Sequence, residues 1–371
     1  MPIHIHPVRG RRDLSRFIDY AYVRNRRDPH WIPPLRIAER ERLSPKKNPF
    51  FGHAEVELLM AWRDGRPIGR IAAIEDHLHN EVHKDNIAMF GFFDAEDLAT
   101  ARALLERVET WARQRGRTSV RGPLNPSLNE SAGLLIDGYD TDSMLMMPHN
   151  PPEYARYIEA AGYRKVKDLY AWLYDLGQPM NPVIERLAAR VRDRERITVR
   201  PLELGDFERE AERLRVIYCG AWEQNWGFVP PTPEEFRRLA NEMRPIFDPR
   251  CSVCAEVDGR PIACAVAIPD INQVLKGTDG RLFPLGLIRL LRRKSIIDQA
   301  RLLLLGVLAG YRGRGLYPLL LVELHRQVAG SRYRRAEFSW VLEDNRDINE
   351  PAERAGARRY KTYRVYQKAL A

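Results

Sequence analysis

A turn built from three glycines and two arginines stands between an apolar strand and a helix, and it constrains the fold more than any other feature of the sequence. Residues 301–308 are a nearly continuous apolar run, typical of a strand buried on both faces. Residues 310–315 supply the turn, and a helical pattern follows at 317–329. This order presents backbone N–H groups and a helix N-terminus to an anion. The sequence therefore predicts a phosphate-binding turn.

Two common nucleotide-binding motifs do not fit this turn. A P-loop would end in Gly-Lys-Ser/Thr, which is missing here. A Rossmann turn needs three spaced glycines and an acidic residue roughly 20 positions later, and the glycines at 310, 313 and 315 fit that spacing poorly. Arg–Gly pairs alone are weak evidence, so the prediction depends on the position of the turn between a buried strand and an amphipathic helix.

The part of the chain around the turn alternates strands and helices. Asp258-Gly259-Arg260 is a hairpin signal between two apolar runs. The pattern predicts strands at 197–201, 252–257, 262–268, 301–308, 335–342 and 358–368, and helices at 207–218, 234–243, 317–329 and 346–354. We define this part as residues 195–371, with an insertion at about 270–300.

Residues 1–177 contain a similar plan. Asp64-Gly65-Arg66 joins two further apolar runs. The expected elements are strands at 54–62, 67–75, 118–122 and up to Tyr174, and helices at 100–115 and 152–161. Residues 178–194, with two prolines and then a charged helix, are the expected linker. Two similar plans in one chain indicate an internal duplication.

Residues 195–371 resemble a domain of the GNAT (N-acetyltransferase-like) superfamily. The family's Arg/Gln-x-x-Gly-x-Gly/Ala loop is similar to 312–317, and its later Asn-then-Gly pattern is similar to Asn345 through Gly356. Residues 50–176 resemble a second, degenerate lobe, because no glycine-rich loop precedes the helix at residue 100. The resemblance implies an α/β (α+β) fold of two GNAT-like lobes, each a mixed, mostly antiparallel twisted sheet flanked by helices.

The resemblance also implies that acyl-CoA or acetyl-CoA is the co-substrate, that no metal is needed, and that the cofactor lies between the strands at 301–308 and 335–342. The residues implied in its binding are Val307, Leu308, Arg312, Gly313, Arg314, Gly315, Leu316, Tyr317 and Asn345. Two positions depart from the family. Tyr317 replaces the last Gly/Ala of the loop, and Ala352 replaces the tyrosine that protonates the leaving thiolate. The general acid is therefore unassigned, and a noncatalytic acyl-CoA sensor or protein-binding module remains an alternative.

Acyl transfer to an amine needs a base and a donor at the thioester carbonyl. We expect the backbone N–H near Leu308 to be the donor. Glu337 is the first candidate base, with Ser339 on the same strand face. Glu343, just past that strand, is the second. The alternative for Glu337 is a simple ion pair with a surface arginine.

Four residues are candidates for binding the acceptor. Trp226 closes the Trp-Glu-Gln-Asn-Trp segment, and Asn272 follows a hairpin strand; a plug of the core and an ordinary turn are their alternatives. Asn129 and Glu130 lie in a long polar loop of the first lobe that also holds His149, and long loops are often functional. For His149 a structural role is the alternative.

Composition and charge limit the partners, the cellular compartment and the metal sites that we expect. The net charge of +10 suits an anionic cofactor, but the basic residues are spread along the chain, so nucleic acid is not an expected partner. No signal peptide and no apolar run of roughly 20 residues is present, and four cysteines suit a reducing cytoplasm. Cys251-x-x-Cys254 lacks a second pair, and the histidines at 77, 79 and 83 fit no single helix or strand spacing. We expect a cytoplasmic protein without a metal site.

The inserted segment 282–294 combines large apolar residues with a basic end. It can lie in a membrane interface, at the inner membrane face, cover a long acyl chain, or pack between the lobes. Two lobes with this insertion resemble bacterial long-chain N-acyltransferases of the ceramide-synthase type. That resemblance implies a fatty acyl-CoA donor and a long-chain, sphingoid-like amine or other lipid-like acceptor.

Overall fold

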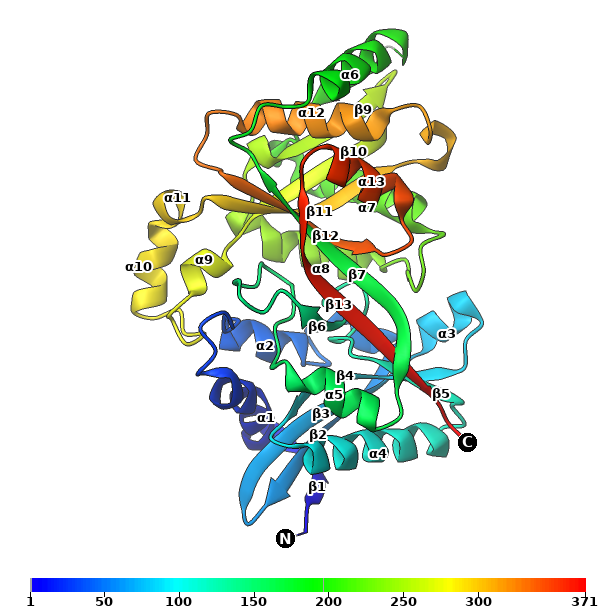
Figure 1. Ribbon diagram of the computed structural model, residues 1–371, viewed down its shortest axis with the longest axis vertical. Helices are drawn as coiled ribbons and strands as arrows, with labels where there is room; N and C mark the ends of the chain where they lie inside the picture. The colour runs from blue at the N-terminus through cyan, green and yellow to red at the C-terminus, as the bar shows by residue number, and fades with distance from the viewer. Residues whose placement is uncertain (1, 196) are drawn as a thin grey trace. The chain divides into compact units, whose positions relative to one another are not determined.

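The computed structural model describes residues 2–195 and 197–371, and the chain divides into two compact units (Figure 1). Unit 1 contains the chain up to Leu169 together with Leu275–Leu287 and Lys361–Ala371, and unit 2 contains Tyr170–Val274 and Ile288–Tyr360. The predicted division at residues 1–177, 178–194 and 195–371 follows the repeated plan of the sequence. The two units instead reflect which residues contact one another, and by this measure Leu275–Leu287 and Lys361–Ala371 belong to unit 1.

Unit 1 is a mixed sheet with helices on both faces. Its strands are β1 (His4–Pro7), β2 (Ala54–Arg63), β3 (Arg66–Asp76), β4 (Ile87–Ala95), β5 (Ser119–Gly122), β6 (Leu134–Asp137) and parts of β7 (Arg164–Asp175) and β13 (Arg358–Ala369). Its helices are α1 (Gly10–Asn25), α2 (Arg36–Arg42), α3 (His77–His83), α4 (Leu98–Gln114) and α5 (Glu153–Ala160), with a 3₁₀ turn at Pro49–Gly52. The strand order is β1-β2-β3-β4-β5-β13-β7, with β6 pairing β13.

Neighbouring residues of β3 show how the helices cover the two faces of this sheet. A Cβ at Gly69 would lie 2.8 Å from Leu104 Cδ1 and from Thr100 Cγ2, so this side of the strand packs on α4. The next residue, Arg70, points the other way and lies over the ring of Phe17 on α1, 5.0 Å from its centroid. The core therefore lies mainly between the sheet and α4.

Unit 2 repeats this construction. Its strands are β8 (Thr198–Arg200), β9 (Ser252–Val257), β10 (Arg260–Pro269), β11 (Gln299–Val307), β12 (Arg335–Leu342) and the remaining parts of β7 and β13. Its helices are α6 (Pro182–Glu195), α7 (Phe207–Trp222), α8 (Pro233–Met243), α11 (Arg293–Ile296), α12 (Leu316–Val328) and α13 (Arg346–Arg354), while α9 (Asn272–Leu275) and α10 (Leu285–Leu291) belong to the insertion. The strand order is β7-β12-β11-β10-β9-β8.

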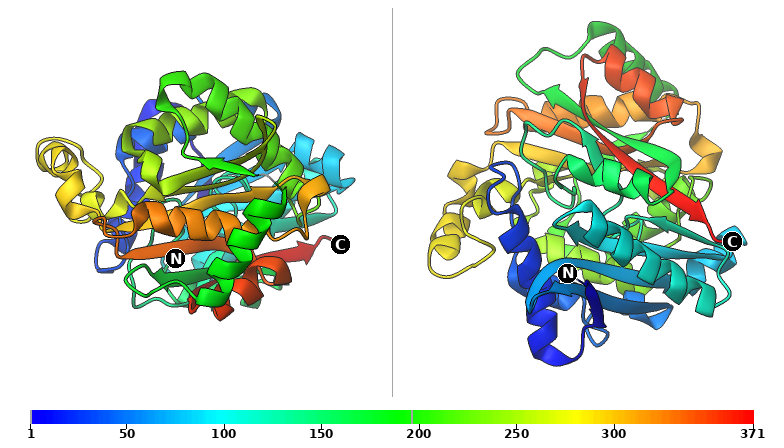
Figure 2. Two further views of the ribbon diagram at one scale, coloured as in Figure 1. Left: turned by 90° about the horizontal axis from the view of Figure 1, so that it is seen from above. Right: turned by 60° about the horizontal axis from the view of Figure 1, so that its bottom comes forward.

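The two units share a strand pattern, as the sequence predicted. In unit 1, β2, β3 and β4 pair antiparallel and β4 pairs β5 in parallel; in unit 2, β9, β10 and β11 pair antiparallel and β11 pairs β12 in parallel. Both predicted Asp-Gly hairpin turns are confirmed, because Asp64, Gly65, Asp258 and Gly259 all have positive φ. Each parallel pair is bridged by a helix, α4 in unit 1 and α12 in unit 2 (Figures 1 and 2).

Opposite faces of the unit 2 sheet carry different helices. A Cβ at Gly306 would lie 2.9 Å from the Cβ of Ala221, so this side of β11 packs on α7. The neighbouring Leu305 faces a cavity that α12 also lines. The side chains of β11 and β12 therefore divide between an α7 side and an α12 side, and the candidate site residues divide with them.

Candidate functional site

The turn between β11 and α12 leaves the helix N-terminus open. Gly313 and Gly315 have φ of +72° and +86°, and no side chain caps α12 at its N-cap residue, Gly315. A Cβ at Gly315 would lie 2.7 Å from Cγ2 of Val191 on α6, so both the backbone conformation and the space require glycine here. The uncapped N–H groups and the helix dipole provide what the predicted phosphate site needs.

The corresponding helix of unit 1 is closed by its own carboxylate. Asp97 is the N-cap of α4, and its Oδ1 accepts hydrogen bonds from the backbone N–H and the hydroxyl of Thr100, both at 2.8 Å. An anionic side chain therefore occupies the position that a phosphate would take. This contrast gives a physical reason why the first lobe looks degenerate and why the anion site is predicted in unit 2.

The two arginines of the turn are exposed and are held locally. Arg312 Nη2 donates to the carbonyl oxygens of Ala221 at 2.8 Å and Gly220 at 3.3 Å, in the last turn of α7. Arg314 lies over the ring of Tyr311, with its Cζ 5.1 Å from the centroid. For Arg312 to bind a phosphate, as the sequence predicts, it must exchange these carbonyl contacts for the anion.

Next to the turn, β11 and β12 separate. They pair in parallel only from Gln299 with Arg335 to Leu302 with Phe338, although both strands continue beyond these residues. The edge of β11 past Leu302 is thus unpaired with β12, which is where the resemblance puts the pantetheine. The Leu308 N–H, the expected oxyanion donor, instead donates to the carbonyl of Ile262 on the β10 side at 3.0 Å.

A largely apolar cavity of about 340 Å³ lies within unit 2, on the α12 side of the sheet. It starts beside Tyr317 and Pro318 in the first turn of α12 and follows one face of that helix to Val328. Further lining comes from Val183, Ile184 and Leu187 of α6, Phe338 of β12, and Ile348 and Ala352 of α13. Burial raises the pKa of the Tyr317 hydroxyl, which stays protonated at this wall.

This cavity changes two expectations. The charged helix predicted as a linker is α6, and its apolar face forms a wall of the cavity. Of the residues that line the cavity in the described part of the chain, none belongs to 282–291, so that segment does not cover this cavity. Ala352, where the family has its tyrosine, is buried in the wall and leaves room that an aromatic ring would fill.

Glu337 lies on the other side of β12 in a buried polar cluster. Its side chain is 0% exposed, and the hydroxyls of Ser339 and Tyr360 donate to its two oxygens. Arg301, its register partner on β11, lies 3.7 Å away and donates from Nε to Ser339 Oγ at 2.8 Å. Glu337 thus lies one residue before the last β11–β12 pair, Leu302 with Phe338, and its carboxylate contacts two hydroxyls.

The other candidates for chemistry, cofactor binding and acceptor binding in unit 2 are Glu343, Asn345, Trp226 and Asn272. Glu343 is half-buried in the turn after β12, and the Asn349 side chain holds that turn by donating to Leu342 O at 2.9 Å. Asn345 is the N-cap residue of α13. Trp226 is half-buried just past the end of α7, and Asn272 begins α9.

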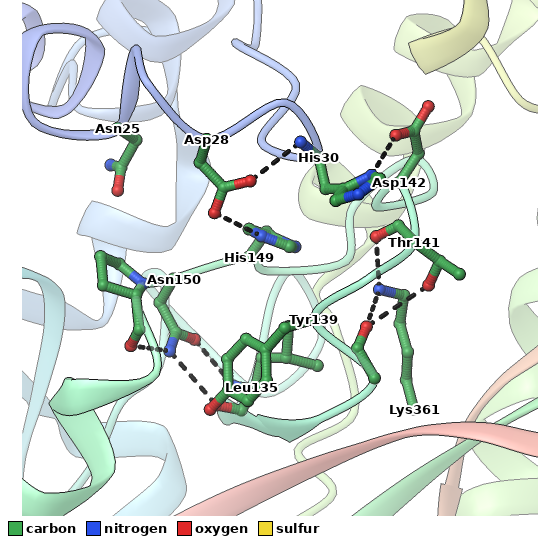
Figure 3. Close-up of polar contacts among 12 residues, drawn as sticks. Asn25, Asp28, His30, Leu135, Tyr139, Thr141, Asp142, His149, Asn150 and Lys361 are labelled. Carbon is green, nitrogen blue, oxygen red and sulfur yellow. Dashed lines mark hydrogen bonds and ion pairs between the residues drawn. The ribbon is translucent and has the colours of Figure 1, made fainter.

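In unit 1, the loop predicted to be functional is held by a polar network (Figure 3). His149 Nε2 lies 3.0 Å from Asp28 Oδ2, and His30 Nδ1 lies 2.9 Å from Asp142 Oδ1. Lys361, fully buried, donates from Nζ to the carbonyls of Gly138 and Thr141 at 2.7 and 2.8 Å. These contacts fix the loop against the N-terminal segment and β13, as Figure 3 shows.

His149 is the unusual member of this network. Its side chain is 1% exposed, and its Nδ1 has no hydrogen-bond partner. Burial lowers its pKa, and the nearby Asp28 carboxylate only partly opposes this effect. Elsewhere in the loop, Glu130 Oε2 lies 3.3 Å from Arg42 Nε, and Asn129 is half-buried.

The cysteines of the Cys251-x-x-Cys254 pattern are buried in the core. Cys251, Cys254 and Cys264 are buried free thiols, and burial raises the pKa of Cys251 and Cys254 to about 12. Across residues 2–195 and 197–371, no group of three or more His, Cys, Asp or Glu side chains is arranged to hold a metal ion. Within the same ranges, no helix is both long and apolar enough to cross a bilayer.

Comparison with known proteins gives full-length matches. No family model matches the chain. It is 38% identical over 377 residues to a bacterial ceramide synthase of Caulobacter vibrioides, with 99% of this chain and 98% of that protein covered. It is 36% identical over 369 residues to protein YghO of Escherichia coli K12, with 97% and 94% covered.

Solved structures with a similar fold are tandem or GCN5-related N-acetyltransferases. A tandem GNAT protein from the clavulanic acid biosynthesis pathway has a TM-score of 0.59 at 13% identity, covering 100% of this chain and 99% of that one. A GCN5-related N-acetyltransferase from Sphaerobacter thermophilus has a TM-score of 0.53 at 14% identity, covering 99% and 96%. The predicted fold class is confirmed, and the chain is a GNAT-type acyltransferase. It belongs to the family of the bacterial ceramide synthase of Caulobacter vibrioides.

Proposed function

We propose that this enzyme transfers a long acyl chain from acyl-CoA to the nitrogen of a long-chain amine. The observation that carries the proposal is the apolar cavity of unit 2, which starts at the uncapped N-terminus of α12. The name of the ceramide synthase relative supports the same substrate class. The loss of the family's tyrosine at Ala352 means that another residue must supply the general acid.

The residues of unit 2 fit a bound CoA in three respects. The α12 N-terminus offers free N–H groups to the pyrophosphate, and Arg312 and Arg314 flank it with positive charge. The unpaired edge of β11 from Leu303 to Val307 offers backbone groups to the pantetheine. CoA bound there would supply the activated thioester, and these residues would orient it.

The cavity fits an acyl chain better than an acetyl group. Most of its lining is aliphatic or aromatic and comes from α6, α12, α13 and the strands of the unit 2 sheet. Its volume lies in the usual range of ligand pockets, about 300–1,000 Å³. Each methylene buried in it would contribute about 0.8 kcal/mol at most. Ala352 is the small residue that keeps the α13 wall open. We infer that the position which lost the family's acid gained room for the chain.

The buried cluster of β12 can move the protons that the reaction requires. When the neutral amine attacks the thioester carbon, a C–N bond forms, the C–S bond breaks, and the nitrogen must lose one proton while the thiolate gains one. We propose that Glu337 accepts the amine proton and that Tyr360 donates its hydroxyl proton to the thiolate. The hydrogen bond between them then returns the proton from Glu337 to Tyr360. Arg301, 3.7 Å from Glu337, provides a positive charge beside this cluster.

The acceptor residues remain proposals from the sequence: Trp226 and Asn272 in unit 2, Asn129 and Glu130 in unit 1. Glu343 remains the alternative base. The peripheral contact with the inner membrane face is argued separately below.

Calorimetric titration with CoA, octanoyl-CoA and palmitoyl-CoA below its micellar concentration tests the proposal. If the chain occupies the cavity, affinity should rise by orders of magnitude from CoA to palmitoyl-CoA, since ten or so methylenes at half of about 0.8 kcal/mol each give roughly 4 kcal/mol. A flat or falling affinity with chain length would reject the long-chain donor and leave the GNAT assignment intact.

A further inference from the structure

The inserted segment exposes more large apolar side chains than any comparable stretch that the structure describes. Phe283 is 78% exposed and Leu291 is 73% exposed, and four others in the same segment are also exposed: Leu282, Leu285, Leu287 and Ile288. The remaining exposed large apolar side chains in the described ranges are scattered, one or two to a segment. Scattered residues of this kind are ordinary, whereas a cluster marks an interaction surface. We call residues 281–294 the basic–apolar patch.

The charge of the patch has one sign. Between residues 280 and 297 the sequence has five basic residues and no acidic residue. Arg292 and Lys294 are exposed directly after the last exposed leucine of α10. An apolar surface followed by uncompensated positive charge is complementary to an anionic lipid surface, in which acyl chains lie beneath negative headgroups.

The patch is a folded element. Arg289 donates from Nε to Val274 O at 2.7 Å and from Nη2 to Gln273 O at 2.9 Å, so its guanidinium fixes α10 to the end of α9. Gly286 is buried, and a Cβ there would lie 2.5 Å from Arg281 O. These contacts hold one side of the segment and leave Phe283, Leu285 and Leu291 facing outward. α10 has only 7 residues, so it can lie in an interface but is too short to cross a bilayer.

We propose that the basic–apolar patch docks the enzyme on the surface of an anionic bilayer, with Phe283, Leu285 and Leu291 among the acyl chains and Arg292 and Lys294 at the headgroups. This inference goes beyond the proposed function and does not depend on it. It also gives a reason for the insertion, because long-chain substrates partition into the same bilayer.

Vesicle co-sedimentation of the full chain tests this proposal. We expect binding to vesicles of phosphatidylcholine with one quarter phosphatidylglycerol, weak binding to pure phosphatidylcholine, and weaker anionic binding as salt rises. Arg292→Glu with Lys294→Glu should lower the partition coefficient by at least about 25-fold, because each basic side chain at such a surface contributes roughly fivefold. Phe283→Ser with Leu291→Ser should lower it by about tenfold or more. If the double variant does not fold, Phe283→Ser alone is measured instead, and it should also lower vesicle binding.

Matched controls come from elsewhere on the chain. Arg11→Glu with Arg12→Glu reverses two exposed charges of the other dense basic cluster, and Val216→Ser removes a singly exposed apolar side chain; neither should change vesicle binding. Equal binding to neutral and anionic vesicles, no binding at all, or binding unchanged by the patch variants would each overturn the proposal. A dimer in solution that the patch variants dissociate, without vesicle binding, would show instead that a second copy covers the patch.

Discussion

Filling the cavity at Ala352 should shorten the acyl chain that the enzyme prefers. Ala352→Phe places a ring where the family carries its tyrosine, in the wall formed by α13. If the ring displaces about four methylenes, at 0.4 to 0.8 kcal/mol each, palmitoyl-CoA loses roughly 1.6 to 3 kcal/mol of binding. The preference for palmitoyl-CoA over octanoyl-CoA should therefore fall by about 15-fold to 200-fold.

The assay is the ratio of kcat/KM for the two donors, measured in competition. Ala352 packs against Trp172, Tyr174 and Val341, so the larger side chain should also cost about 1–3 kcal/mol of stability, which a melting curve would reveal. Leu321→Phe fills the same cavity from α12, where the site is less tightly buried. Ala329→Phe, at an exposed position after α12, is the matched control. A folded Ala352→Phe protein with unchanged chain-length preference would refute the location of the acyl chain.

Three further predictions concern the turn, the proton relay and pH. Arg312→Glu should weaken CoA binding by at least about 1–2 kcal/mol in calorimetry, because a charge-assisted contact becomes a repulsion. Glu337→Gln should lower kcat by about 10² to 10⁴ without changing CoA affinity, and Tyr360→Phe should lower kcat with a long-chain donor. Burial lowers the pKa of His79 to about 4 in the folded protein against about 6.5 when unfolded, so stability present above pH 6.5 should fall by up to about 3 kcal/mol toward pH 4, as chemical denaturation would measure.

Each of these predictions has an outcome that would contradict it. Arg209→Glu, at an exposed arginine of α7, should leave CoA affinity unchanged; equal CoA affinity in the Arg312 variant would remove the turn from the site. If turnover survives Glu337→Gln, then loss of turnover in Glu343→Gln would assign the base to Glu343. For pH, His79→Gln should flatten the loss of stability between pH 6.5 and 4; an unchanged pH profile in this variant would contradict the effect of burial.

Local signals in the sequence predicted much of the fold. The Asp-Gly turns identified both hairpins, because both residues of such a turn need positive φ. The glycine-rich turn was likewise predicted from its glycines, two of which have positive φ. The strand before it and the helix after it were predicted from their apolar patterns. Strand β4 was missed because all nine of its residues are buried, so it shows no alternation, and no Asp-Gly hairpin signal or glycine-rich turn adjoins it.

The site depends on contacts that no local pattern records. The apolar face of α6 was hidden among its arginines, so a cavity wall looked like a linker. The hydrogen bond from Tyr360 to Glu337 joins residues on different strands, and only the fold brings them together. The period-2 spacing that places Ser339 on the same strand face as Glu337 was the signal that the sequence offered for this cluster.

The reaction product tests the central claim most directly. Purified enzyme would be incubated with palmitoyl-CoA and a long-chain amine, and mass spectrometry would quantify the amide while a thiol reagent quantifies free CoA. The account predicts one N-palmitoyl amide for each CoA released, with both products formed about 10² to 10⁴ times more slowly by the Glu337→Gln protein. Release of CoA without amide, or tight palmitoyl-CoA binding without turnover against any long-chain amine, would contradict it.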